Sequence, residues 1–244
     1  MPRPIEAAPA APDKRIATAD WAGIAAALDM RGYAVLPGLL GGAECGALAA
    51  LYDEDEPFRS RVVMARHAFG LGEYKYLRYP LPPPVETLRE ALYPRLAAVA
   101  NLWHERLGAV ARFPATLAAY LEECHAAGQV RATPLILKYE AGGYNCLHQD
   151  LYGAHVFPLQ ATVLLSAPGR DFAGGEFMLV EQRPRLQSKG EVVPLGEGDA
   201  VVFAVNHRPV AGKRGFYRVT MRHGVSRLHA GRRFALGIIF HDAT

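Results

Sequence analysis

Two residues of types that bind divalent metals lie two positions apart in the second half of the chain, at His148 and Asp150. Side chains two apart point to the same side of an extended strand, so both could face one cavity. One imidazole and one carboxylate suit a divalent ion of intermediate hardness, and two histidines with one carboxylate are typical of non-haem iron sites. An H-x-D pair can arise by chance in a chain with nine histidines, so a metal site needs a third ligand from elsewhere.

A histidine and an arginine downstream have a spacing that could complete such a site. His223 precedes Arg233 by ten positions, and Arg233 begins an apolar segment. An arginine at the start of an inward-facing strand is costly to bury unless it meets an anion. A guanidinium matches a carboxylate through two parallel hydrogen bonds, so Arg233 is a candidate for a dicarboxylic keto acid. Alternation along the strand does not decide between Arg233 and its neighbour Arg232.

The chain that must position these residues has two regions with different patterns of apolar and polar residues. Up to about residue 130 the pattern is mostly helical, beginning at Asp20, which can cap the first helix. Helices are expected over residues 20–28, 43–52, 85–107 and 115–127, with a short strand at 33–36. After Thr133 short apolar segments alternate with Gly, Pro and Asp, which predicts strands. These strands are expected over residues 135–139, 156–165, 176–180, 191–195, 200–205, 218–221 and 234–240.

The order of these elements favours an α+β fold. Closely spaced strands without intervening helices argue against a parallel βαβ sheet and for an antiparallel jelly roll. The predicted architecture is a double-stranded β-helix (jelly-roll) core over about 133–244, with flanking N-terminal helices over about 20–130. Residues 1–19, rich in Ala and Pro at their start, are expected to form a disordered tail. Residues 20–244 are expected to form a single domain.

Composition excludes several classes of protein. Three widely spaced cysteines without a C-x-x-C pair argue against a thiolate zinc site or a disulfide framework. No apolar run approaches the ~20 residues of a membrane span, and no secretory signal is visible, so a cytoplasmic location is expected. The formal charge of +3 is compatible with an anionic partner without requiring one. The sequence does not indicate an oligomeric state.

The region from Tyr139 to Phe240 resembles the 2-oxoglutarate/iron(II) oxygenase superfamily, in its prolyl-hydroxylase-like branch. The shared pattern is H-x-D, a Gly-Gly-Glu turn, a Gly-Asp turn before a strand, and then His and Arg about ten apart. It is matched by His148, Asp150, Gly174-Gly175-Glu176, Gly198-Asp199, His223 and Arg233. The resemblance implies Fe(II) bound by the two histidines and Asp150, and 2-oxoglutarate bound by Arg233 and Tyr139. It also implies consumption of O2, with decarboxylation of 2-oxoglutarate coupled to C–H hydroxylation.

Nearly the whole chain is similar to a bacterial oxygenase family named for proposed oxidative demethylation of damaged nucleic acid. The segments that carry this likeness are 145–153, 181–187 and 222–226. The well-studied alkylation-repair demethylases carry a further arginine six residues after the first, whereas position 239 here is Ile. Two alternatives therefore stay open: a hydroxylase of a protein side chain or small metabolite, and a jelly-roll module that binds metal or ligand without turnover.

Basic and aromatic residues are interleaved between residues 58 and 80, which could pair with phosphates and stack on bases. The substrate contacts expected there are Arg66, His67, Tyr74 and Tyr76. The same segment could equally be a helix-to-barrel connection with solvated arginines. Arg183 and Arg185 follow a predicted strand and could contact substrate from a rim loop, although most rim arginines meet only water.

His229 and His241 are rivals of His223 for the third metal position. His229 lies in the turn before Gly231, too close to Arg233 for the geometry that the resemblance implies. His241 lies eight residues after Arg233 and is expected on the surface at the opposite rim. Asn145 and Tyr152 are expected to contact the metal ligands from behind.

Overall fold

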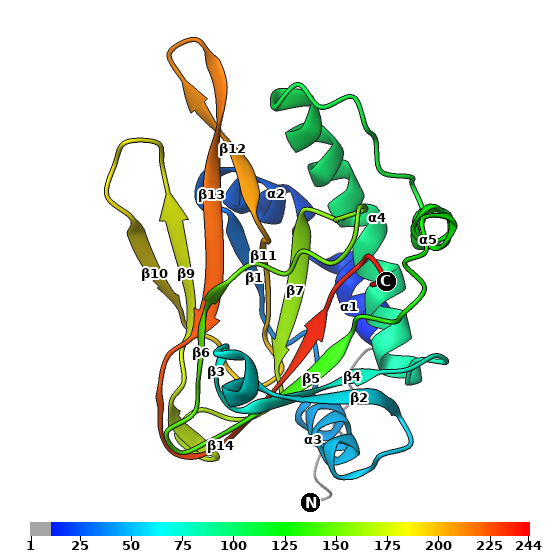
Figure 1. Ribbon diagram of the computed structural model, residues 1–244, viewed down its shortest axis with the longest axis vertical. Coiled ribbons are helices and arrows are strands. Elements are labelled where there is room, and N and C mark those ends of the chain that lie inside the picture. Colours follow the sequence, from blue (N-terminus) through cyan, green and yellow to red (C-terminus); the bar gives the residue numbers. More distant parts are fainter. Residues whose placement is uncertain (1–10) are drawn as a thin grey trace, which may run out of the picture.

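The computed structural model describes residues 11–244, and its strands form two antiparallel sheets with helices packed outside the larger one (Figure 1). The larger sheet has the order β1-β11-β7-β14-β5-β4-β2, with β8 beside β14; the smaller has the order β10-β9-β13-β6-β3, with β12 beside β13. The strands are β1 (Tyr33–Leu36), β2 (Phe58–Val63), β3 (Gly70–Leu71), β4 (Glu73–Leu77), β5 (Leu135–Glu140), β6 (Tyr144–His148), β7 (Leu159–Leu164), β8 (Phe172–Gly174), β9 (Phe177–Gln182), β10 (Lys189–Val193), β11 (Ala200–Ala204), β12 (His207–Gly212), β13 (Gly215–Val225) and β14 (Leu228–Ile238). The helices are α1 (Pro12–Thr18), α2 (Trp21–Arg31), α3 (Gly42–Ala50), α4 (Pro83–Arg106) and α5 (Leu117–Ala126), with short 3-10 turns η1 (Leu51–Asp53) and η2 (Met64–His67). The predicted α+β jelly-roll class is confirmed.

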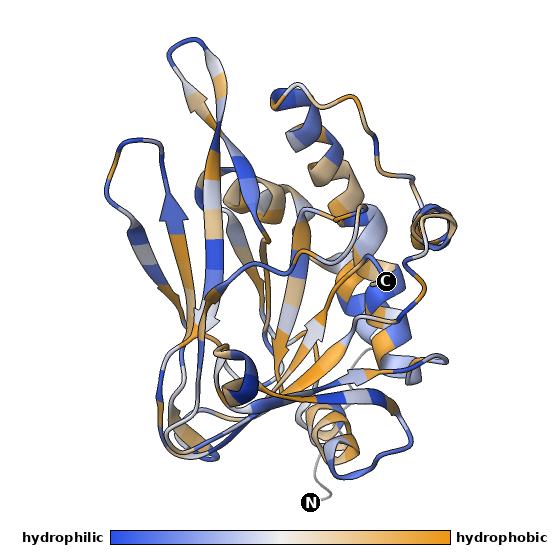
Figure 2. Cartoon of the chain, viewed as in Figure 1, coloured by the Kyte–Doolittle hydropathy of each residue, from blue (hydrophilic) through white to orange (hydrophobic). Residues whose placement is uncertain are grey.

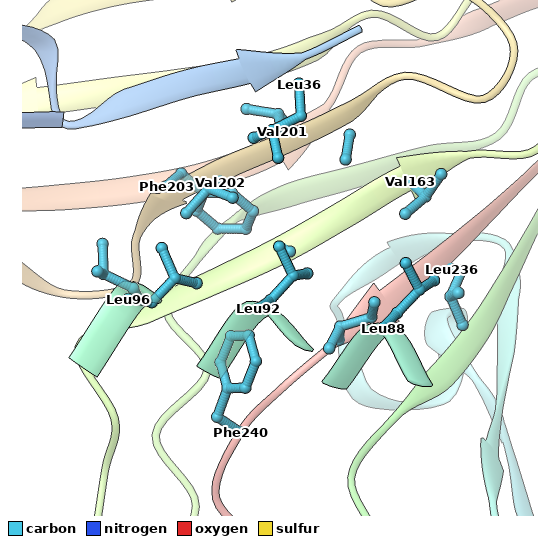
Figure 3. Packing of buried hydrophobic residues seen from close by; sticks show 14 of the residues in the cluster. Leu36, Leu88, Leu92, Leu96, Val163, Val201, Val202, Phe203, Leu236 and Phe240 are labelled. Atoms are coloured by element: carbon cyan, nitrogen blue, oxygen red, sulfur yellow. The ribbon is translucent and has the colours of Figure 1, made fainter. Parts of the chain in front are cut away.

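Helix α4 covers the outer face of the larger sheet because its leucines recur at helical spacing. Leu88, Leu92 and Leu96 are fully buried and pack towards Val163 and Phe240, which come from the sheet side (Figure 3). Burial of one such leucine contributes ~1.5–3 kcal/mol relative to exposure. This outer layer fixes the central strands in place and leaves their inner faces free to form a site.

The sheet interior is apolar and the loop tips are polar. Figure 2 shows hydrophobic segments along β5, β7 and β14 and hydrophilic residues at the β9–β10 and β12–β13 tips. Gly198 lies in the turn before β11 with φ +82°, where a Cβ would come within 2.0 Å of the Leu40 carbonyl oxygen. Only glycine fits this close approach, and it lets the turn before β11 pack against the segment that follows β1.

Three sequence expectations differ from the structure. Residues 1–10 of the expected tail lie outside the described residues, but Pro12–Thr18 form α1 with Ile16 1% exposed, so the prediction of a tail is wrong there. The apolar contacts of Ile16 with the core outweigh the weak local signal. The stretch 58–77, expected within the mostly helical part, contains β2, β3 and β4. Strands β6 and β12 were not predicted either, since their polar residues mask the alternation.

Within residues 11–244, no helix is long and apolar enough to cross a membrane.

Candidate active site

His148, Asp150 and His223 come together on the inner face of the smaller sheet. His148 ends β6 and pairs in register with His223 of β13, and their ring centroids are 4.2 Å apart. The Asp150 carboxylate lies 3.6 Å from His148 Nε2 and 3.4 Å from His223 Nε2. One ligand atom from each residue lies within 4.8 Å of the others, and residues 11–244 contain no other such group of three.

The directions of the pKa shifts of His148 and Asp150 suit the binding of a metal cation. Burial lowers the pKa of His148, and the neighbouring His223 lowers it further. Burial by itself would raise the pKa of Asp150, but the hydrogen bond and charge of His223, together with His148 and Tyr152, hold that pKa below its ordinary value. Neutral imidazoles and an ionised carboxylate are the forms that bind metals. The Nδ1–H of His148 donates to the Cys146 carbonyl at 2.8 Å, which leaves Nε2 as the ligand atom.

Tyr152 contacts the cluster from behind, as expected. Its hydroxyl donates to Asp150 Oδ1 at 2.8 Å and lies 3.2 Å from the Tyr76 hydroxyl. The Tyr152 backbone is held in turn by the buried Gln129, whose amide nitrogen donates to the Tyr152 carbonyl at 2.9 Å. Since a hydrogen bond to a ligand carboxylate fixes its orientation, Tyr152 limits how Asp150 can rotate.

A cavity of about 340 Å³ lies between the two sheets and joins this cluster to Arg233. Its floor on β14 is formed by Arg233, Ala235 and Gly237, which alternate along the strand and face inward. Arg233 is 2% exposed, and its guanidinium lies 5.7 Å from the Tyr139 ring centroid and 5.9 Å from that of Phe172. The small residues Ala235 and Gly237 leave open space between the cation and the metal-ligand cluster.

The buried Arg233 side chain is not paired with an anion from residues 11–244. Among residues 11–244 it has no carboxylate within 4.0 Å, and its Nε has no hydrogen-bond partner. Among the same described residues, the buried Tyr139 hydroxyl on the neighbouring strand also makes no hydrogen bond. A buried cation and a phenol that both lack partners fit a carboxylate ligand. Arg232, the open alternative, is instead exposed and lies 3.5 Å from Glu140.

The predicted substrate residues separate into three groups. Tyr74 lines the cavity, whereas Tyr76 lies behind it against Tyr152. Arg66 and His67 are exposed on η2, next to the cavity mouth. Arg183 and Arg185 do not line the cavity: Arg183 follows the end of β9 and lies four residues beyond Leu179, which pairs with His223, or ~13 Å away. Arg183 there donates to Glu181 at 2.6 Å.

The surface placement expected for His241 is wrong. His241 is 1% exposed, and its Nδ1 accepts a hydrogen bond from the Phe157 amide at 3.2 Å. Burial, with a contribution from Arg89, lowers the pKa of His241 to about 4. It nevertheless lies outside the three-residue cluster, and His229 is exposed.

Sequence reasoning missed two polar residues of the cavity wall. Gln160 and Thr162 on β7 line the cavity and are 4% and 7% exposed. They lie within an expected apolar strand, and the only signal was two polar residues at a spacing of two. Missed too were Phe177 and Phe203, whose ring centroids lie 6.1 and 4.6 Å from that of His223.

The sequence of this chain matches a known protein family. Residues 72–243 match the model of a family described as an oxygenase catalysing oxidative methylation of damaged DNA. Two uncharacterized proteins from Mycobacterium tuberculosis strains (CDC 1551 / Oshkosh and H37Rv) are each 50% identical over 164 residues, covering 67% of this chain and 70% of theirs.

Solved structures share the fold at low sequence identity. A Trichoplax adhaerens prolyl hydroxylase in complex with a hypoxia inducible factor peptide is 15% identical with a TM-score of 0.56, over 94% of this chain and 91% of that one. A prolyl 4-hydroxylase from Phytophthora capsici is 16% identical with a TM-score of 0.54, over 95% and 66%. Because the family model spans more than half of the chain, this protein belongs to that oxygenase family.

Proposed function

We propose that the chain oxidatively demethylates N-methylated bases in nucleic acid, with Fe(II) bound by His148, Asp150 and His223. The three side chains offer two imidazole nitrogens and one carboxylate from one side of the cavity. This ligand set leaves the opposite side of a bound ion open to other molecules. Residues 20–244 would work as one domain, because a single buried cluster runs from Ile16 to Phe240.

Arg233 and Tyr139 are proposed to bind the distal carboxylate of 2-oxoglutarate. The guanidinium offers paired N–H donors and the phenol a further O–H donor, in a site shielded from water by Phe172. Arg233 would thereby orient the keto-acid end towards the metal ligands across Ala235 and Gly237. Because the cluster and Arg233 are both held by paired strands, their separation is fixed before the ligand binds.

When bound, the iron and 2-oxoglutarate together activate O2, so that one oxygen atom enters succinate with loss of CO2 and the other enters a substrate C–H bond. If that bond belongs to an N-methyl group, the hydroxymethyl product releases formaldehyde and leaves an N–H on the base. The chain's own residues exclude water from this step: Phe177 and Phe203 cover one side of His223.

One observation supports a nucleic-acid substrate, namely an exposed aromatic pair at the cavity mouth. Phe69 and Leu147 line the cavity yet are 47% and 41% exposed, so they mark its opening. His67 stacks on Phe69 with ring centroids 5.3 Å apart and planes 24° from parallel, and Arg66 precedes them on the same exposed turn. Flat aromatic surfaces beside a cation are suited to stacking bases and meeting phosphates. The matching family is described as acting on damaged DNA, which supports the same substrate class.

The test is succinate formation from 2-oxoglutarate with Fe(II) and ascorbate, with and without single-stranded DNA carrying N-methylated bases. His148→Ala is the blank, because it removes a metal ligand. Stimulation by methylated DNA with release of formaldehyde would support the proposal. Succinate that forms regardless of DNA, and is lost in the variant, would redirect the search to protein side chains or small metabolites. A cytoplasmic location stays a prediction.

A further inference from the structure

Gln160 and Thr162 form a polar pair on the inner face of an otherwise apolar central strand. All six residues of β7 are buried, since the strand lies between β11 and β14 in the larger sheet. Val163 faces the helices in the hydrophobic core (Figure 3), so Gln160 and Thr162 face the cavity, which both line. A strand that needed only to pack would carry aliphatic residues at both positions.

The Gln160 side chain is buried without a partner for its oxygen. It is 4% exposed, and Oε1 accepts no hydrogen bond from residues 11–244. The other buried glutamine, Gln129, is fully satisfied: the two N–H groups of its Nε2 lie within hydrogen-bond distance of three carbonyls, and its Oε1 accepts from the His155 amide at 2.7 Å. Leaving a buried amide oxygen unpaired is costly. The contrast between the two glutamines indicates that Gln160 is kept for a ligand.

Gln160 lies at the end of the cavity away from Arg233. Thr162 pairs with Gly237 and Leu164 with Ala235. If this register continues, Gln160 lies opposite position 239, and the backbone of that position is six residues, or ~20 Å, along the chain from Arg233. Gln160 is next to Phe203 on β11, whose ring centroid is 4.6 Å from that of His223. Gln160 therefore lies on the metal-ligand side of the cavity, whereas Arg233 lies at the other end.

We propose that Gln160 is a specificity-determining residue that reads the amino edge of an N-methylated adenine. The inference rests on the proposed function and names the base. A carboxamide presents a donor and an acceptor side by side, and glutamine pairs in this way with the exocyclic N6 amino group and N7 of adenine. N1 lies on the other side of the amino group, so a base held by its N6/N7 edge can turn an N1-methyl carbon towards the metal ligands.

The first test separates a ligand-binding role from a structural one. Gln160→Leu removes the polar group while keeping most of the volume, and Gln129→Leu is the matched control. We expect the melting temperature of Gln160→Leu to equal or exceed that of the wild type, because no protein hydrogen bond to Oε1 is lost. Gln129→Leu should melt several degrees lower, because it leaves three carbonyls and an amide unpaired. A comparable drop in Gln160→Leu would overturn the proposal.

The second test pairs the protein change with a substrate change, using Fe(II)-loaded enzyme and single-stranded oligonucleotides. One oligonucleotide carries N1-methyladenine, and the other carries N1-methylpurine, which lacks the exocyclic amino group. Wild type should favour N1-methyladenine in kcat/KM by about 10- to 100-fold. Gln160→Leu should lose this preference, because neither base can then donate to the carboxamide.

The outcomes are distinct. Equal discrimination by wild type and Gln160→Leu would sink the role of Gln160 while leaving the demethylase function intact. Weaker 2-oxoglutarate binding in Gln160→Leu, with the base preference unchanged, would assign Gln160 to the co-substrate and overturn the proposal. No turnover of either oligonucleotide by the wild type would refute the proposed function itself, and the adenine assignment with it.

Discussion

Replacing Arg233 by methionine should weaken 2-oxoglutarate binding and at the same time stabilise the protein in the absence of 2-oxoglutarate. Methionine has a similar length, so it keeps the contacts of the buried stem with Phe172 and Tyr139. The guanidinium it removes is 2% exposed and has no carboxylate within 4.0 Å among the described residues. Opposite signs for binding and stability are expected when a buried charge is kept for a ligand.

The magnitudes follow from what Arg233 gains and loses on burial. Burying an unpaired ion costs several kcal/mol, and two aromatic rings return ~0.5–2 kcal/mol each, which leaves a net cost of ~1–3 kcal/mol. In a chain of this size 1 kcal/mol corresponds to ~2–4 °C, so Arg233→Met should melt ~2–12 °C higher. Two charge-assisted hydrogen bonds to the ligand contribute ~1.5–3 kcal/mol each, so the Kd for 2-oxoglutarate should rise by ~10²- to 10⁴-fold.

Thermal unfolding with and without 2-oxoglutarate and a divalent metal measures both effects in one assay. Wild type should gain ~3 kcal/mol at a ligand concentration 100 times its Kd, whereas Arg233→Met should gain almost nothing. Arg232→Met is the matched control, because Arg232 is exposed beside Glu140 and should change stability by less than ~0.5 kcal/mol. Ligand-free Arg233→Met that melts lower than wild type and binds 2-oxoglutarate normally would refute this reasoning.

Three further substitutions test the surroundings of the site and the fold. Tyr152→Phe removes the hydrogen bond to Asp150 Oδ1 and should weaken metal binding by ~10-fold in a metal titration. Tyr120→Phe, whose hydroxyl makes no hydrogen bond within residues 11–244, should bind metal normally. His241 has a folded pKa of about 4 against 6.5 unfolded, so its contribution is complete above pH 6.5 and falls by about 3 kcal/mol by pH 4. His241→Asn keeps an acceptor for Phe157, and its denaturation curves should lack that part of the acid loss; an unchanged loss would contradict the pKa. Gly198→Ala places a Cβ 2.0 Å from the Leu40 oxygen and should lower the unfolding free energy by ~3 kcal/mol. Gly38→Ala, with open space around it, should lower the unfolding free energy by only ~1–2 kcal/mol. Equal losses in the two variants would count against the close packing at Gly198.

The metal cluster was predictable because few residue types bind divalent metals and because two of the three candidate ligands lie only two positions apart. The period of two along a strand placed His148 and Asp150 together, and the resemblance supplied His223. Arg233 could not be separated from Arg232, because alternation gives two faces and the tertiary structure decides which one is inside. In the structure Arg233 pairs with Tyr139 on β5 and faces the cavity.

The misplaced and missed elements share a physical cause, which is tertiary contact that the local pattern does not encode. β2 is polar and partly exposed, so its strand signal was weak until pairing with β4 was seen. The position of His241 was estimated from an extended chain, but the chain turns back after β14, and Ala243 bridges Arg131. Gln160 was read as part of an apolar strand, although its buried polarity is a property of the cavity face.

The central claim is that the three-residue cluster and Arg233 together bind Fe(II) and 2-oxoglutarate in the cavity between the sheets. The most direct measurement is an anaerobic titration of the apoprotein with Fe(II) and then 2-oxoglutarate, followed by the visible charge-transfer absorption of the chelated complex. The band should appear in wild type and Arg232→Met, be absent in His223→Ala, and require ~10²-fold or more 2-oxoglutarate in Arg233→Met. A band of normal intensity in His223→Ala, or normal affinity in Arg233→Met, would contradict the site.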